Sequence, residues 1–159
     1  MKEGGVKPPK SDRHIFRLDR RLVYEIARRI DVIYPDAPLA LRSLRREGCQ
    51  LFLASGADSG YVKGALEAAR LDRLFQETYS PDRVNAFKGS IKYWKRILES
   101  SRAQPEFSIV VDDRLRFLKT PERMGLTPIL VARKKPADSK ILTIRHLREV
   151  PQIVRRLQS

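Results

Sequence analysis

The stretch that decides the fold is His14-Ile15-Phe16-Arg17-Leu18-Asp19-Arg20-Arg21-Leu22-Val23. Its short apolar run, Ile15 to Leu18, predicts a β-strand, and charged residues gather where that strand would end. From Leu22 onward, apolar residues recur every three or four positions, which is typical of an amphipathic helix. A strand followed at once by a helix indicates an α/β fold, and such folds bind ligands just beyond the carboxyl ends of their strands.

The rest of the chain repeats this alternation of strand and helix. We predict further strands at 50–54, 77–80, 107–111, 127–131 and 141–144, and helices at 20–34, 39–48, 59–70, 90–101, 115–124 and 147–157. Pro35 is expected to stop the first helix, and Gly48 and Gly125 to close two others. The pattern predicts an α/β domain with a mostly parallel sheet of about five strands and helices on both faces.

Length and composition indicate one domain in a reducing compartment. Of the 159 residues, 1–13 are predicted to form a flexible basic N-terminal arm and 14–159 the α/β domain. No apolar run approaches the roughly 20 residues of a membrane helix, and the N-terminus lacks the apolar segment of a signal peptide. A single cysteine, Cys49, excludes an intrachain disulfide and argues against a zinc cluster. We therefore expect a cytoplasmic protein without a membrane or disulfide partner.

Charge is the strongest compositional signal. Lys and Arg number 33 against 19 acidic residues, which gives a formal net charge of +14. Phosphate polymers favour such an excess, because each neutralised phosphate releases counterions. No aromatic RNA-recognition motif, KH loop or zinc finger is present, so the composition favours recognition of RNA by shape and phosphate rather than by base sequence.

Residues at the predicted strand ends form an ordered set that resembles the haloacid dehalogenase (HAD) family. Leu51 to Gly56 resembles its second motif, Lys88 its third-motif lysine, and Ile109 to Asp113 its acidic fourth motif. The opening stretch resembles the nucleophile motif, in which Asp-x-Asp-Gly-Thr follows a strand. Further similar segments extend the resemblance from Ile15 to Leu157. It implies a Rossmann-like core without a sizeable cap domain.

The resemblance also assigns roles, and the chain departs from them at one decisive place. In the family an Asp attacks phosphorus and a second Asp, two residues later, acts as the acid and base. Here Asp19 stands at the second position, but Arg17 replaces the nucleophile and Arg20-Arg21 replace Gly-Thr. A guanidinium stays protonated and has no lone pair with which to attack phosphorus. The family also holds phosphate with the Ser55 position and neutralises it with the Lys88 position.

We therefore expect a degenerate site without catalytic residues, cofactor or bound metal, formed by Arg17, Asp19, Ser55, Lys88, Asp112 and Asp113. Arg17 is expected to pair with Asp112 or Asp113 and to fill the metal position. Phe117 stands where many family members carry another acid. If Asp19 were instead the nucleophile, Arg21 would fall at the acid/base position, and Asp31 and Asp36 lie too far along the chain to substitute. Taken singly, Ser55 could be a loop serine, Lys88 a solvated lysine, and one of the paired aspartates a helix cap.

Three functions remain open at this point. The leading hypothesis is a catalytically inactive HAD-fold protein that binds RNA, such as rRNA in a ribosome, with neighbouring ribosomal proteins as further partners. The alternative is a divergent phosphatase acting on a phosphorylated small molecule or nucleotide, in which Asp112 and Asp113 would hold Mg²⁺. A regulatory pseudoenzyme that binds a protein partner is the third. The residues predicted to bind phosphate or RNA are Arg17, Arg20, Arg21, Lys88, Arg114, Arg116, Arg133, Lys134 and Lys135.

Overall fold

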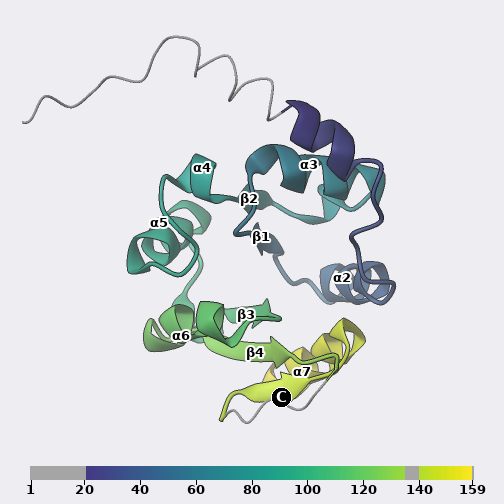
Figure 1. Ribbon diagram of the computed structural model, residues 1–159. Coiled ribbons are helices and arrows are strands. Elements are labelled where there is room, and N and C mark those ends of the chain that lie inside the picture. Colours follow the sequence, from purple (N-terminus) through teal and green to yellow (C-terminus); the bar gives the residue numbers. More distant parts are fainter. Residues whose placement is uncertain (1–20, 135–139, 159) are drawn as a thin grey trace, which may run out of the picture.

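The structure is a computed structural model that describes residues 21–134 and 140–158 (Figure 1). Short parallel strands form its centre. β1 (Phe52–Ala54) pairs with β2 (Glu77–Tyr79) in one sheet. In the other sheet, β4 (Thr127–Val131) lies between β3 (Ile109–Asp112) and β5 (Leu142–Ile144). All of these pairings are parallel, which confirms the predicted α/β class. The predicted arm 1–13 and the predicted strand 15–18 lie outside the described residues, as do residues 135–139.

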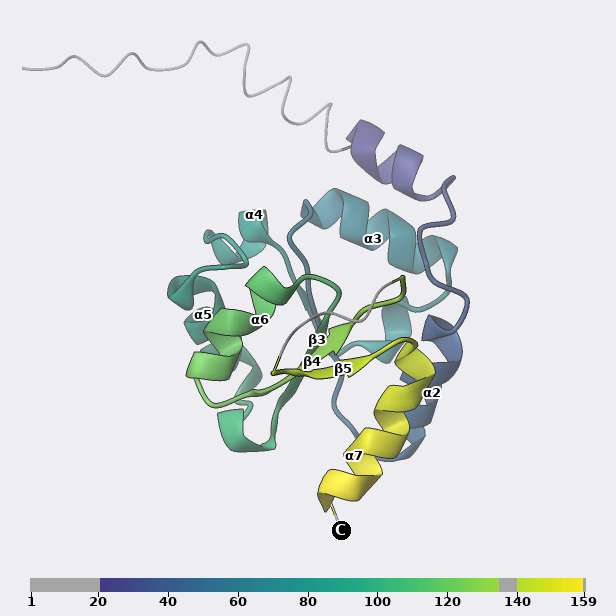
Figure 2. The same cartoon turned by 60° about the horizontal axis from the view of Figure 1, so that its bottom comes forward.

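Helices cover both faces of the strands. Figure 2 shows α5 and α6 on one side of β3 and β4, and α2 and α7 on the other. The helical elements are residues 21–27, α2 (Ala37–Arg46), α3 (Ser59–Ala68), α4 (Pro81–Val84), α5 (Ile91–Ser101), α6 (Leu115–Arg123) and α7 (Val150–Gln158), with short 3-10 turns η1 (Asp72–Leu74), η2 (Pro105–Phe107) and η3 (Leu147–Glu149). None of the described helices is long and apolar enough to cross a membrane.

The core follows from the alternation of side chains along each strand. Successive residues of a strand point to opposite faces, so one strand can serve two apolar clusters. On one face, Val110 and Leu130 pack with Tyr93, Trp94 and Leu118. A second cluster, on the other face, contains Ile109, Val111, Ile129, Leu44 and Val154. These two clusters attach the helices to the sheet.

Local signals placed several helix ends correctly. The carboxylate of Asp58 accepts from the Gly60 amide at the start of α3, and the Ser90 hydroxyl accepts from the Tyr93 amide at the start of α5. Gly48 and Gly125, which follow α2 and α6, have φ angles of +83° and +89°. Glycine adopts this left-handed conformation without steric cost, which confirms both predicted helix ends.

The main differences from the prediction lie at three places. The first helix ends at residue 27 rather than 34, because the Asp31 side chain accepts from the Ile33 amide and favours a turn before Pro35. Phe107 belongs to the η2 turn rather than to β3, and its side chain is 83% exposed. The short helix α4 was not predicted; Pro81 begins it and Asn85 ends it in a left-handed conformation.

Candidate functional site

Lys88 joins the carboxyl ends of β1 and β3. Its Nζ donates to the carbonyl oxygen of Ala54 at 2.8 Å and to Oδ2 of Asp112 at 2.5 Å. The Lys88 side chain is 11% exposed and the Asp112 side chain 7%. A buried charge needs a close partner of opposite charge, so this lysine is held in place rather than solvated.

The two adjacent aspartates have different surroundings. Besides Lys88, Asp112 accepts through Oδ1 from the Arg114 amide at 2.8 Å, so both of its oxygens are engaged. Asp113 is exposed. Asp112 is therefore compensated by a lysine and a backbone amide, whereas Asp113 is open to solvent.

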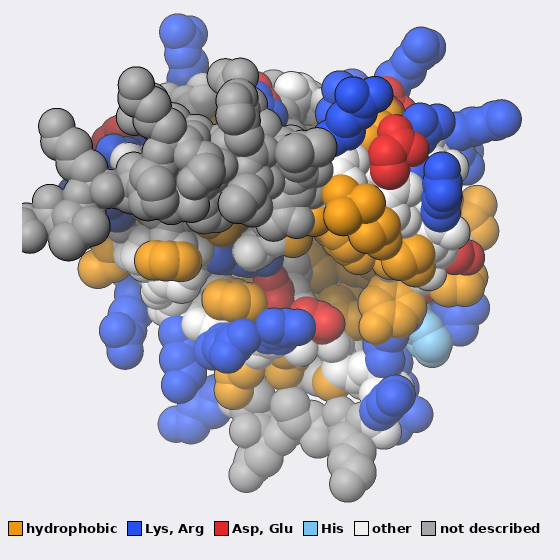
Figure 3. Space-filling view, turned by 45° about the horizontal axis from the view of Figure 1, so that its top comes forward, with side chains coloured by type: hydrophobic (Ala, Val, Ile, Leu, Met, Phe, Trp, Pro, Cys, Tyr) orange, Lys and Arg blue, Asp and Glu red, His pale blue; other side chains and the backbone are white. Residues whose placement is uncertain are grey.

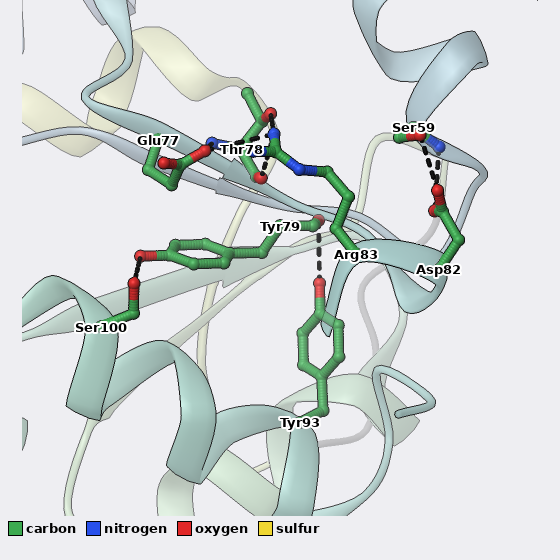
Figure 4. Close-up of polar contacts among 8 residues, drawn as sticks. All are labelled: Ser59, Glu77, Thr78, Tyr79, Asp82, Arg83, Tyr93 and Ser100. Atoms are coloured by element: carbon green, nitrogen blue, oxygen red, sulfur yellow. Dashed lines mark hydrogen bonds and ion pairs between the residues drawn. The ribbon is translucent and has the colours of Figure 1, made fainter. Parts of the chain in front are cut away.

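Ser55, which follows β1 directly, is fixed by its neighbours. Its Oγ accepts from the Ala57 amide at 3.0 Å, and its carbonyl accepts from the Tyr93 hydroxyl at 2.9 Å. The same hydroxyl lies 2.9 Å from the Tyr79 carbonyl (Figure 4). Burial raises the pKa of Tyr93 well above the ordinary tyrosine range, so its proton is retained for these bonds. The Ser55 hydroxyl accepts in this bond, so its own hydrogen is not used by it.

Aromatic and glycine residues border the Lys88 side chain. The Phe117 ring centroid lies 5.3 Å from Lys88 Nζ, a favourable cation–π distance. Gly56 also lies beside the lysine, since a Cβ there would be 4.0 Å from Lys88 Cδ. Thr120 of α6 donates to the Gly89 carbonyl at 2.8 Å and so attaches this segment to α6. In the sequence, Phe117 was noted only because it stands where many family members carry an acidic residue. In the structure, its ring lies next to the Lys88 ammonium.

The described residues do not by themselves fit a Mg²⁺ site. They contain no group of three or more His, Cys, Asp or Glu side chains able to hold a metal. Asp112 is already bonded to Lys88, so the adjacent Asp113 is the exposed carboxylate at the end of β3. Arg17 and Asp19 lie outside the described residues, so the predicted pairing of Arg17 with Asp112 or Asp113 stays a prediction.

The remaining predicted basic residues fall into two groups. Arg21, Arg114, Arg116 and Lys134 are exposed, and the Arg116 guanidinium lies 4.8 Å from the Phe117 ring centroid. Arg133, in contrast, is an internal contact: its guanidinium lies 3.0 Å from Asp36 Oδ1 and 3.7 Å from the centre of the Tyr34 ring. Arg17, Arg20 and Lys135 lie outside the described residues.

Asp36 acts as a structural carboxylate. Its Oδ2 accepts from the Leu147 amide at 2.6 Å, so it links the start of α2 to η3 and to Arg133. Burial raises the pKa of this carboxyl, but the bonds from Arg133 and Leu147 outweigh burial, and the net pKa lies below the usual aspartate value. Its two oxygens are thus committed to the fold rather than to chemistry.

Polar contacts also line the outer edge of β2, which the sequence did not indicate (Figure 4). Arg83 donates to the carbonyl of Thr78 at 3.2 Å and to its Oγ1 at 3.1 Å, and pairs with Glu77 at 3.2 Å. Asp82 accepts from the amide and hydroxyl of Ser59. Open hollows of about 440 and 380 Å³ lie here, away from Lys88. Within their linings Arg83 pairs with Glu77 and Lys63 with Glu67, so Lys88 remains the better candidate for ligand chemistry.

Comparison with known proteins supports the fold assignment. Residues 2–125 match the family model of the haloacid dehalogenase-like hydrolases. None of the curated proteins matches the chain. Among solved structures, a HAD phosphatase from Thermococcus onnurineus is similar at 25% identity and a TM-score of 0.71, over 77% of this chain and 58% of that one.

Two dehalogenases show the same fold. An L-2-haloacid dehalogenase from Xanthobacter autotrophicus is 16% identical, with a TM-score of 0.70, over 95% of this chain and 69% of its own. A further dehalogenase, solved with an intermediate complex, is 19% identical, with a TM-score of 0.72, over 76% of this chain and 56% of its own. This chain thus spans less than two thirds of some of the proteins that it resembles.

Proposed function

Because the chain belongs to the haloacid dehalogenase-like hydrolase family, we propose that it binds the phosphate group of a phosphorylated ligand at Lys88. The buried ammonium of Lys88 carries this proposal. An ammonium has three donors, and Ala54 and Asp112 take two of them, so one remains for a phosphate oxygen. The Ser55 hydroxyl supplies a second donor at the same strand ends. Bonds from charged donors to phosphate are among the stronger hydrogen bonds.

The described residues favour binding over hydrolysis. A nucleophilic carboxylate needs an unbonded oxygen that faces the phosphorus, and both oxygens of Asp112 are engaged. Among the described strand-end residues this leaves Asp113 as the exposed carboxylate, and the second acidic residue that hydrolysis requires would be Asp19, which lies outside the described part. The divergent phosphatase remains the alternative for this reason.

Titration with inorganic phosphate tests the proposal. We expect Lys88→Met and Ser55→Ala to weaken binding, with a loss of about tenfold or more for Lys88→Met, because one charge-assisted bond contributes roughly 1.5–3 kcal/mol. Lys92→Met, at an exposed lysine of α5, is the matched control and should bind like the parent. Equal phosphate affinity in all four proteins would reject the site. Mg²⁺-dependent turnover of p-nitrophenyl phosphate that disappears in Asp19→Asn would replace binding with hydrolysis.

A second candidate function, RNA binding, is favoured by the surface charge. Figure 3 shows Lys and Arg side chains spread around the face in view, interrupted by few acidic ones. Exposed basic residues include Arg28, Arg29, Arg42, Arg70, Arg73, Lys92, Lys95, Arg114, Lys119, Arg123, Lys134, Lys140, Arg145 and Arg148. We propose that this excess binds the phosphates of structured RNA, with rRNA as the first RNA to test.

Salt dependence distinguishes this candidate from phosphate binding at Lys88. Binding to rRNA should weaken linearly on a plot of log affinity against log salt. The double variant Arg114→Ala/Lys134→Ala should reduce the slope by about two if both residues contact phosphates. Lack of RNA binding at low ionic strength would reject this function and leave the phosphate site unaffected. Cosedimentation of the native protein with ribosomal particles would identify the partner.

A further inference from the structure

One layer of the molecule exposes arginine as its only charged residue. α2 and α7 lie side by side on one side of the sheet, and η3 contacts both helices (Figure 2). Within the segments 36–48 and 145–157, the exposed charged residues are Arg42, Arg45, Arg46, Arg145, Arg148, Arg155 and Arg156. We call this surface the arginine face.

The acidic side chains of the same two segments are engaged by the fold. They are Asp36, Glu47 and Glu149, and none of them is exposed. Each accepts at least one hydrogen bond from a backbone amide or a side chain of the protein. Asp36 also pairs with Arg133, and Glu47 with Arg155. The arginine face therefore presents positive charge without an exposed carboxylate in between.

The layer on the other side of the sheet has a mixed surface. Along α5 and α6, the segment 91–123 exposes lysines and arginines together with Glu99, Glu106, Asp113 and Glu122. Charges of opposite sign weaken each other's potential at a distance, whereas a surface of one sign attracts a polyanion. The arginine face is thus the better surface for a partner with many phosphates.

The geometry of both helices directs the arginines toward solvent. Leu44 of α2 and Val154 of α7 belong to one core cluster with the buried residues of β4. Arg42 and Arg46 each lie two residues from Leu44, about 160° around the helix, so their side chains leave on the opposite side. Arg156 has the same relation to Val154. A guanidinium has five donors and can bind two oxygens of one phosphate.

The other exposed residues of these segments indicate the kind of partner. They are Leu39, Gly48, Gln152 and Leu157, and none is aromatic. Surfaces that bind single strands stack the bases on aromatic side chains, whereas double-stranded RNA is bound through its phosphates and 2′-hydroxyl groups. A helix that lies on a membrane turns its apolar face to the lipid. Here the apolar faces of α2 and α7 pack on the sheet instead.

We propose, resting on the RNA-binding function above, that the arginine face binds the phosphate backbone of double-stranded RNA. The partner is read by shape and phosphate spacing, because no helix of this layer projects from the sheet to enter a groove. Arg45 and Arg155 each use a donor within the protein, on the Cys49 carbonyl and on Glu47, and keep further donors for phosphate.

Two triple variants of the full chain with equal loss of charge test the proposal. Arg42→Gln/Arg46→Gln/Arg148→Gln changes the arginine face, and Lys92→Gln/Lys95→Gln/Arg123→Gln changes the exposed surface of α5 and α6. The probe is an RNA duplex of about 20 base pairs, long enough to follow the face. The first variant should bind at least about tenfold more weakly, with a salt slope reduced by about two to three, and the second should bind like the parent. Thermal unfolding checks that both variants fold.

The same variants show which results would overturn the proposal. Equal weakening in both triples would assign RNA binding to overall charge, and the RNA-binding function would survive without this surface. Equal or tighter binding of single-stranded poly(U), or tighter binding of a DNA duplex, would overturn the duplex RNA assignment. Binding to phosphatidylserine vesicles that is lost only in the first triple, without a loss of RNA binding, would assign the face to lipid. A parent chain that binds no RNA at low salt would instead reject the RNA-binding function itself.

Discussion

The two edges of the β1–β2 pair differ sharply. Arg83 covers the outer edge, since its guanidinium bonds to the outward carbonyl of Thr78 and pairs with Glu77. On the inner edge, Phe52 and Ala54 present backbone groups that pair with no described strand. Exposed strand edges attract other strands, and charged side chains are a common way to block them. The chain thus covers one edge of this pair with its own side chain, whereas the opposite edge has no paired strand among the described residues.

Lys88→Ala should have the largest effect, because it removes the bonds that join the carboxyl ends of β1 and β3. The buried Asp112 carboxylate would lose its charged partner, and we expect a loss of roughly 3 kcal/mol in the free energy of unfolding. Chemical denaturation measures this loss. Lys92→Ala is the control and should stay within about 0.5 kcal/mol of the parent. A similarly small change in Lys88→Ala would show that the two strand ends do not need this bond.

Asp36→Asn should have the next largest effect, since Asp36 links α2 to the sheet that contains β4. We expect a loss of about 2 kcal/mol at neutral pH from weaker bonds to Arg133 and Leu147. The pKa of Asp36 is lowered in the fold, so its contribution is present above about pH 4 and is lost as the pH falls through the folded-state pKa. Denaturation between pH 2 and 7 should show a smaller acid loss in Asp36→Asn, and parallel curves would contradict this role.

Tyr93→Phe should cost less, about 1 kcal/mol, by removing the hydroxyl that bonds at the ends of β1 and β2. The raised pKa of Tyr93 means that its contribution is complete below about pH 10 and is lost as the pH rises further. The variant should therefore lose less stability than the parent between pH 9 and 11. Thermal unfolding across this range is the measurement, and an equal alkaline loss in both proteins would contradict it.

Arg83→Ala should have the smallest effect on stability, about 0.5 kcal/mol or less, because its ion pair is half exposed. Its consequence should instead be association, since the outward edge of β2 would be uncovered. Size-exclusion chromatography over a range of concentrations should detect dimers or larger species in Arg83→Ala but not in Arg83→Lys, which keeps a charge on the edge. If Arg83→Ala stays monomeric, Arg83 does not protect the outer edge of β2 from association.

Periodicity in the sequence predicted most elements. The strand at Thr127–Val131 was predicted residue for residue, and the helix at Ile91–Ser101 within one residue, because β-branched runs and Ser90 are strong local signals. Local signals did not reveal the early end of the first helix, which depends on the Asp31 side chain, or the break between the two sheets. Which strands pair depends on tertiary packing, and the periodicity of a single sequence does not specify it.

The site was predicted less completely than the fold. The resemblance placed Ser55, Lys88 and Asp112 together at strand ends, and the structure brings Lys88 and Asp112 into contact. It did not indicate that the Tyr93 hydroxyl would bond to the Ser55 carbonyl, 38 residues away in the sequence. A tyrosine on the apolar face of a helix is more often an ordinary core residue. Arg133 belonged to a basic run in the sequence, yet it packs on Tyr34 and Asp36, a contact made across about 100 residues.

Gly64 of α3 has a consequence for which substitutions the chain can accept. A Cβ at this position would lie 2.5 Å from the Tyr24 carbonyl oxygen and 3.1 Å from Ala27 Cβ. The Tyr24 carbonyl belongs to the backbone and cannot rotate away as a side chain would. Even alanine, the smallest substitution, would push helix 21–27 away from α3. A single absent methyl group thus sets how closely these two helices can approach each other.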